Sequence, residues 1–307
     1  MSFNYKFTDS DIPFRDYPSN KVKNGKRYLL IRGEYLTFPQ EYHYHQYLVS
    51  VLLANAIGPQ LFTDQNDSSA FRSLLFSHIK KMTSNPSGEA YRATNADVYL
   101  VTTASDIELL FINDKLDQDL LKRLRSQSDS EMRGAILEIS AAAAFLRAGY
   151  SVDWLKGESL PEFTASKSKQ IDVEVKRRNR TGKVEFDMDK EIKANRQNLA
   201  KALKKKRKNP YIVFLDSDIP PKSSKENKIF YDRCREEFGN YELEGVAVVI
   251  SNNGYEHDGA AIESGKNSVM VIQGNNSPDQ KMIEEIIRSL HSKLPPPISS
   301  GWQTKVG

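Results

Sequence analysis

Hydrophobic and polar residues alternate most clearly in residues 170–178, which read QIDVEVKRR. Three aliphatic residues alternate there with two acids and a lysine: Ile171, Val173 and Val175 against Asp172, Glu174 and Lys176. Successive side chains of a β-strand point to opposite faces, so the pattern predicts a strand with one aliphatic and one charged face. Either the charged face is solvated, or it forms part of an active site.

The segments around this strand predict an α/β domain. Residues 130–150 carry apolar side chains at helical spacing and reach Gly149, a usual residue just past a helix end. Strands are expected at YSVDWL and LPEFTAS, and the aliphatic runs YIVFLD and GVAVVIS are typical of strands buried on both faces. A helix over 189–208, a strand at SVMVIQ and a final helix capped by Ser277 complete the pattern. This order predicts a mixed central sheet flanked by helices, with the 170–178 strand in its interior.

The first 125 residues have a different pattern, which predicts a mainly helical unit. Helices are expected over 39–59 and 68–82, a strand at DVYLVTTA (97–104) and a short helix over 117–127. We therefore expect a mainly helical domain over 1–125, whose role no motif indicates, and an α/β domain over 126–295. A flexible tail is expected over 296–307.

Composition narrows the class of protein. The chain has 307 residues, of which 39% are hydrophobic and 27% charged, which is enough for two domains. No run approaches the roughly 20 apolar residues of a membrane helix, so we expect a cytoplasmic protein without a membrane partner. The single cysteine, Cys234, excludes an internal disulfide and a zinc cluster of thiolates.

Charge is concentrated in one block. Residues 176–208 contain fourteen Lys or Arg and four acids, a local balance of +10 in a chain whose net charge is +4. Such a block suits the phosphate backbone of nucleic acid. A solvated helix with a lysine-rich C-terminal end, favoured by the helix dipole, is the alternative interpretation.

The predicted position of the charged strand favours an active site. Glu174 and Lys176 on an interior strand covered by helices cannot simply lie in water, and burying unpaired charge costs several kcal/mol. A divalent metal with a phosphate substrate compensates this cost, because carboxylates bind Mg²⁺ and an ammonium faces the phosphate.

The order of these residues resembles the PD-(D/E)xK nuclease superfamily, which has the restriction-endonuclease-like fold. Over residues 130–275, Glu138 lies in the first helix, PEF (161–163) is similar to the PD element and EVK (174–176) to the (D/E)xK element. Gln197 follows in a helix where several members carry an accessory polar residue. Glu162 departs from the usual aspartate, and its extra methylene places metal geometry in question.

The resemblance implies a Mg²⁺-dependent nuclease, with Mn²⁺ as a substitute, that acts on nucleic acid, DNA being favoured, and forms a homodimer as many relatives do. Its catalytic residues would be Glu138, Glu162, Glu174 and Lys176, the lysine positioning or deprotonating the attacking water. The metal ligands would be Glu162, Glu174 and the carbonyl of Val175. Asp172 is either an additional ligand or the partner of a nearby cation. The expected contacts to nucleic acid are Arg177, Arg178, Arg180, Lys193, Arg196, Gln197 and Lys201.

The sequence also allows two other interpretations of the function. The Glu162 departure also suits a nuclease-fold module that binds nucleic acid without hydrolysing it, and an unrelated α/β protein that binds small molecules or proteins is a third class. An acid two residues before a lysine is common, and occurs here at Glu191, Glu226 and Asp279 too. Those three are assigned to a helix, a polar loop and the start of the last helix, so only Glu174 lies on a predicted interior strand.

Overall fold

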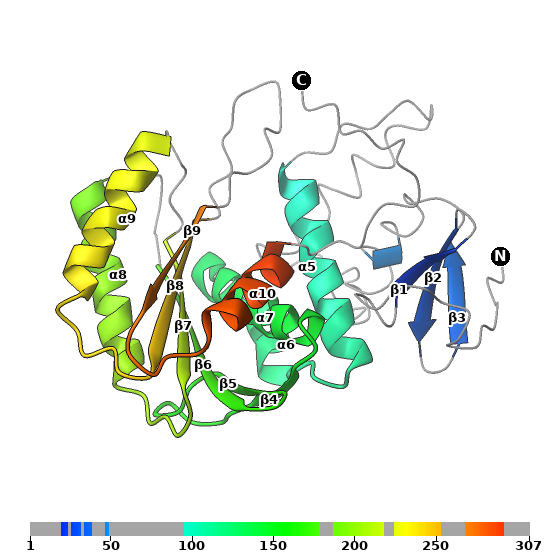
Figure 1. Ribbon diagram of the computed structural model, residues 1–307. Helices are drawn as coiled ribbons and strands as arrows, with labels where there is room; N and C mark the ends of the chain where they lie inside the picture. Colours follow the sequence, from blue (N-terminus) through cyan, green and yellow to red (C-terminus); the bar gives the residue numbers. More distant parts are fainter. Residues whose placement is uncertain are drawn as a thin grey trace. The chain divides into compact units, whose positions relative to one another are not determined.

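The computed structural model describes residues 20–23, 26–31, 34–38, 47–48, 95–178, 187–217, 224–252 and 268–291 (Figure 1). The chain divides into two compact units, one of residues 1–148 and 292–305 and one of residues 149–291 and 306–307. The domain division expected at residues 125 and 126 stays a prediction. The helices predicted over 39–59 and 68–82, except Tyr47 and Leu48, and the tail over 296–307 lie outside the described residues.

The first unit contains a small antiparallel sheet and three described helices. The sheet, which the sequence pattern did not predict, has the order β1 (Asn20–Lys23), β2 (Lys26–Ile31) and β3 (Glu34–Phe38). The helices are α5 (Asn95–Ile112), α6 (Gln118–Leu124) and α7 (Asp129–Arg147). Helix α7 packs against α5 and α6, and its four consecutive alanines at 141–144 are buried.

The strand predicted at 97–104 is wrong, because these residues lie inside α5. Valine, tyrosine and threonine favour strands, but α5 is buried on most sides from Leu100 to Leu110. A short apolar run without alternation does not distinguish a buried helix from a buried strand. The short helix predicted over 117–127 is confirmed as α6.

The second unit is an α/β fold with a six-stranded mixed sheet flanked by helices. Its strands lie in sequence order: β4 (Ser151–Trp154), β5 (Phe163–Ser166), β6 (Gln170–Arg177), β7 (Tyr211–Asp216), β8 (Val246–Asn252) and β9 (Ser268–Gln273). The β6–β7 and β7–β8 pairs are parallel and the other pairs are antiparallel. The predicted interior position of β6 is therefore confirmed.

Three helices belong to this unit: α8 (Met188–Leu203), α9 (Ser224–Phe238) and α10 (Gln280–His291). Figure 1 shows α8 and α9 on one side of the sheet and α10 on the other. The cap predicted at Ser277 is wrong, since the Asp279 carboxylate accepts from the backbone N–H groups of Lys281 and Met282. None of the described helices has the length and apolar character of a membrane span.

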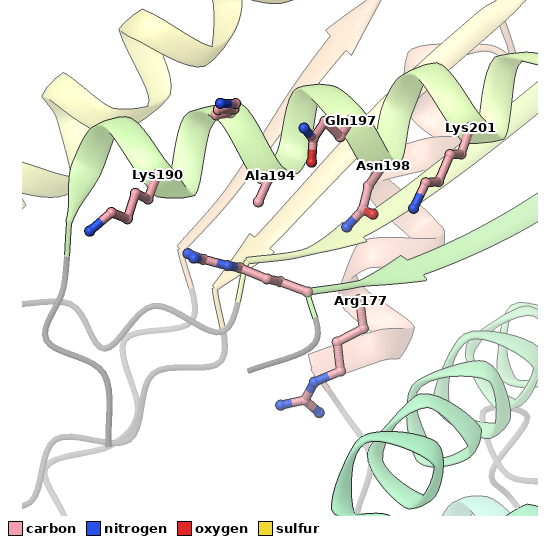
Figure 2. Close-up of a pocket in the computed structure, with 8 residues that line it drawn as sticks. Arg177, Lys190, Ala194, Gln197, Asn198 and Lys201 are labelled. Atoms are coloured by element: carbon pink, nitrogen blue, oxygen red, sulfur yellow. The ribbon is translucent and has the colours of Figure 1, made fainter. Parts of the chain in front are cut away.

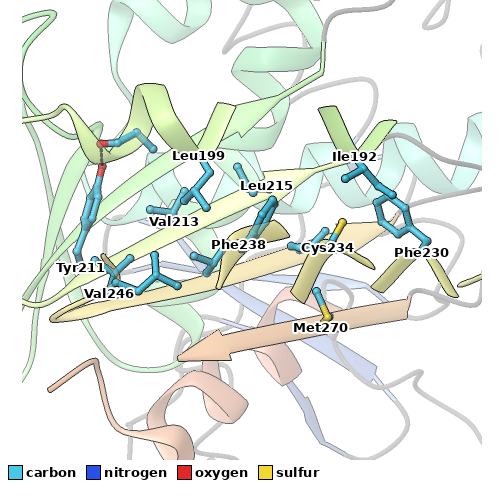
Figure 3. Packing of buried hydrophobic residues seen from close by; sticks show 14 residues of the cluster. Ile192, Leu199, Tyr211, Val213, Leu215, Phe230, Cys234, Phe238, Val246 and Met270 are labelled. Atoms are coloured by element: carbon cyan, nitrogen blue, oxygen red, sulfur yellow. Dashed lines mark hydrogen bonds between the residues drawn. The ribbon is translucent and has the colours of Figure 1, made fainter. Parts of the chain in front are cut away.

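The core of the second unit lies between β7, β8 and the α8–α9 pair (Figure 3). Helix α8 contributes Ile192 and Leu199, and the Tyr211 hydroxyl donates to the Ala202 carbonyl at 3.1 Å. Helix α9 contributes Phe230, Cys234 and Phe238 at intervals of four residues. Helix α9 was not predicted, and Glu226 was expected in a loop, because the apolar stripe of α9 is narrow and most of its other residues are charged or polar.

Candidate active site

The β5–β6 pairing brings two glutamates together. Phe163 pairs with Val173 in this antiparallel ladder, and the Glu162 N–H donates to the Val173 carbonyl at 3.0 Å. Glu162, which directly precedes β5 rather than lying inside the strand, is thus placed beside Glu174 of β6. The alternation along β6 also puts Lys176 on the same face of the strand as Glu174. This face packs toward α8, because Glu174 pairs with Val213, which belongs to the core beneath α8.

The three side chains converge as the sequence predicted. The Lys176 Nζ donates to Glu162 Oε1 at 3.4 Å and forms an ion pair with Glu174 Oε1. The Glu174 side chain is 0% exposed, whereas 22% of Lys176 and 27% of Glu162 are exposed. One carboxylate is therefore fully enclosed, and the other carboxylate and the ammonium reach the surface.

A fourth charged group, Lys205, lies next to these three. Its Nζ is 3.7 Å from Glu174 Oε1 and donates to the Glu158 carbonyl at 2.7 Å. Lys205 was not predicted as a site residue, because it is the second of five consecutive basic residues and nothing in the sequence distinguishes it from the other four. In the structure Lys205 and Arg207 are half-buried, and Lys204, Lys206 and Lys208 are exposed.

The site shifts the pKa of its central groups. Burial raises the pKa of Glu174, Lys176 lowers it and Glu162 raises it again, so that the pKa is raised overall. Burial lowers the pKa of Lys176, but Glu174 and Glu162 raise it above its usual value. Lys176 is therefore a cation at neutral pH, which suits charge stabilisation better than removal of a proton from water.

The burial and hydrogen bonding of Glu162 and Glu174 decide whether this site suits a metal ion. Glu174 Oε2 is buried and has no hydrogen-bond partner among the described residues, a costly state that a hard cation would relieve. The described residues contain no group of three His, Cys, Asp or Glu side chains placed to hold a metal. Two carboxylates suffice for Mg²⁺, which keeps several waters and takes further oxygens from a phosphate substrate. The pair fits such an ion.

Asp172 has a different set of contacts. Burial alone would raise its pKa, but hydrogen bonds from the Asn209 side chain, the Lys208 and Asn209 N–H groups and the Thr164 hydroxyl lower it. All four bonds measure between 2.8 and 3.2 Å. The three from Lys208 and Asn209 fix the turn between α8 and β7 to β6, and the one from Thr164 joins β5 to β6. Its predicted roles as a ligand or as the partner of a cation gain no support from these contacts.

Glu138 lies in α7, in the first compact unit. Both of its oxygens accept from the Arg123 guanidinium of α6 at 2.7 Å. This bidentate pair joins α6 to α7. The catalytic role expected for Glu138 stays a prediction, as does that of the Val175 carbonyl.

A basic hollow lies beside the end of β6 and has a volume of about 420 Å³ (Figure 2). Its lining consists of Arg177, Arg178, Lys190, Lys193, Ala194, Gln197, Asn198 and Lys201. Five of the seven residues predicted to contact nucleic acid are in this set. Arg196 instead pairs with Glu237 of α9 at 3.1 Å, and Arg180 lies outside the described residues.

Comparisons of the chain with protein-family models, with curated proteins and with solved structures found no match. The geometry of Glu162, Glu174, Lys176 and the basic hollow is therefore the basis for assigning a function.

Proposed function

We propose that this chain is a Mg²⁺-dependent nuclease with a restriction-endonuclease-like fold, which hydrolyses phosphodiester bonds of nucleic acid, DNA being the expected substrate. The observation that carries the proposal is the fully buried Glu174, whose Oε2 has no hydrogen-bond partner among the described residues and lies in a cluster with Glu162 and Lys176. A scaffold without ligand chemistry gains nothing from such a group, because an unsatisfied buried oxygen costs about 1–3 kcal/mol.

The residues have separate roles in this proposal. Glu162 and Glu174 would hold the cation, with the Val175 carbonyl between Glu174 and Lys176 as a further oxygen. A divalent cation in such a site polarises the phosphate and lowers the pKa of a bound water. The Lys176 ammonium remains protonated beside both carboxylates and stabilises the negative charge that develops on the phosphate. The basic hollow holds the backbone of the substrate.

One set of contacts favours a second candidate, a nuclease-fold module that binds nucleic acid without cleaving it. Lys176 and Lys205 already neutralise Glu162 and Glu174 in the absence of a cation. This candidate predicts salt-sensitive binding of DNA by the basic hollow without uptake of Mg²⁺ or Mn²⁺.

Cleavage of plasmid and single-stranded DNA in Mg²⁺ or Mn²⁺ tests the proposal. Glu174→Gln and Lys176→Met keep the size of each side chain, and each should lower the rate about 10²-fold or more, since each removes a charge from the reacting centre. Glu158→Gln is the matched control: Glu158 is exposed, in the loop that carries Glu162, and its backbone carbonyl, which binds Lys205, is retained.

Thermal unfolding of each variant separates loss of chemistry from loss of fold. Cleavage that survives both Glu174→Gln and Lys176→Met contradicts the proposal. A wild-type chain that binds DNA, does not cleave it and shows no heat of Mg²⁺ or Mn²⁺ binding by calorimetry establishes the second candidate instead.

A further inference from the structure

The lining of the basic hollow differs from that of a surface that only follows phosphates. Five cations contribute to it, and no acid does. Between the cations lie two neighbouring amides, Gln197 and Asn198, with Lys193 and Lys201 one helical turn away on either side. Phosphate oxygens only accept hydrogen bonds, so contacts to phosphate use donors or positive charge, whereas a side-chain amide also offers an acceptor, which a base edge can use.

These central side chains are available to a ligand. Among the described residues, the side chains of Lys193, Gln197, Asn198 and Lys201 form no hydrogen bond or ion pair. Figure 2 shows Ala194, Asn198 and Lys201 on the side of α8 that faces the end of β6. Arg178 is held at the wall by an ion pair with the buried Glu191 of α8. The hollow therefore combines a fixed wall with uncommitted donors and acceptors.

The size of the hollow fits more than a phosphate. Its volume of about 420 Å³ lies within the usual range for small-molecule sites and accommodates a phosphate, a sugar and a base. Ala194 keeps the space between Lys190 and Asn198 open, because its side chain is a single methyl group. The hollow also adjoins the C-terminal end of a strand that begins a parallel pair, a usual place for ligands in α/β sheets.

We propose that the basic hollow holds one whole nucleotide of the substrate, with its phosphate against Lys193 and Lys201 and its base against Gln197 and Asn198. The inference deepens the proposed function and depends on it for the identity of the substrate as nucleic acid. A side-chain amide matches the N6 donor and N7 acceptor of adenine, so the preferred base is adenine. Gln197 and Asn198 then determine specificity, and Lys193 and Lys201 determine affinity.

Binding of short homo-oligonucleotides to the full chain tests whether the amides determine specificity and the lysines determine affinity. Fluorescence anisotropy in EDTA at low salt compares oligo-dA, oligo-dC and oligo-dT, and calorimetry compares dAMP with dCMP. The wild-type chain should bind oligo-dA about 5-fold or more tightly than the other two, in line with the discrimination of a single amide–base contact. The double variant Gln197→Ala, Asn198→Ala should bind all three alike.

Lys193→Gln and Lys201→Gln test the contribution of the lysines to affinity. Each should weaken binding of all three oligonucleotides by a similar factor and lower the salt dependence of log K by about 1, because each removes one phosphate contact. Ala194→Met should weaken the binding of every nucleotide, because the longer side chain fills the hollow without changing its charge. Ala200→Met, on the same helix but outside the hollow, is its control.

The outcomes separate this inference from the proposed function. Equal wild-type affinity for the three oligonucleotides, or a base preference that survives in the double variant, overturns the inference while metal-dependent cleavage still stands. A base preference without cleavage supports the nucleotide site and contradicts the nuclease. Binding of dAMP over dCMP without binding of any oligonucleotide supports a nucleotide site but overturns nucleic acid as its ligand.

Discussion

At the scale of single residues, β6 carries two buried acids with opposite surroundings. Asp172 accepts four hydrogen bonds, from two backbone N–H groups and two neutral side chains. Glu174, two positions further on the same face, has two ammonium groups near one oxygen and no hydrogen-bond partner among the described residues at the other. The first acid stabilises the fold, and the second has coordination capacity to spare.

Asp172→Asn should lower the free energy of unfolding at pH 7 by about 2 kcal/mol, because an amide nitrogen then faces N–H donors in place of a charged acceptor. The lowered pKa of Asp172 means that the unfolded chain takes up this proton more readily than the folded one. Its contribution is complete above about pH 4 and is lost as the pH falls through the lower folded pKa.

Urea denaturation at pH 7 and pH 3 measures this effect, with Glu242→Gln as an exposed control. The difference between wild type and Asp172→Asn should shrink at the lower pH. Equal free energies of unfolding for the two proteins at pH 7 would show that the turn between α8 and β7 does not depend on Asp172.

The centre of the candidate site was predictable from sequence, and its surroundings were not. Strand alternation alone places Glu174 and Lys176 on one face, and a preceding antiparallel strand brings Glu162 to the same place. Lys205 and Arg196 depend on tertiary contacts: the former meets Glu174 from the turn after α8, and the latter is paired with Glu237 on the unpredicted helix α9. Neither contact can be derived from the order of residues along the chain.

At the scale of elements, the sequence pattern predicted correctly the strands that have one apolar face and the strands that are buried on both faces. β6, with its alternation, and β7 and β8, with their aliphatic runs, fall in this class. It failed for α5, whose residues favour strands locally, and for α9, whose core contacts repeat only every four residues. Burial by neighbouring elements decided both cases, and local preference did not.

The turn after β9 packs tightly against the turn before β8. Gly274 donates its N–H to the Val246 carbonyl, and Gly245 donates to the Asn275 carbonyl at 2.7 Å. A methyl group on Gly274 would overlap the backbone carbonyl of Leu243, which no side-chain rotation relieves. Gly274→Ala should therefore separate the two turns and cost about 3 kcal/mol or more.

Gly245→Ala is the matched comparison for this change. Gly245 has a φ of +70° but open space around the added carbon, so alanine there should cost only the backbone strain of about 1–2 kcal/mol. Thermal unfolding of both variants compares the two costs. An equal or smaller loss for Gly274→Ala would contradict the close packing of the turns.

At the scale of the whole molecule, the second compact unit has a core of its own. Its sheet, α8, α9 and α10 supply their own buried residues, while α7 buries its apolar face against α5 and α6. A fragment of residues 149–291 should therefore fold cooperatively, and a fragment of residues 126–295 should expose the apolar face of α7 and aggregate more readily.

Circular dichroism melts and light scattering of the two fragments measure this difference. A cooperative melt only for the longer fragment would assign α7 to the α/β domain, as the sequence division at residue 126 predicts. Either result identifies the smallest piece of the chain on which the carboxylate pair can be studied.

The pairing of β6 on both edges determines which positions of this protein can be substituted without moving Glu174. β6 is hydrogen-bonded on both edges, antiparallel to β5 and parallel to β7, so the backbone beneath Glu174 is fixed by two neighbours. The basic hollow is built mostly from successive turns of one helix, α8. Under the proposed function, the groups for the reaction and the groups for recognition therefore lie on different elements, β6 with the residue before β5 on one hand and α8 on the other. If the proposed function holds, a library randomised only at Lys193, Gln197, Asn198 and Lys201 should alter what is recognised and leave Glu162, Glu174 and Lys176 in place.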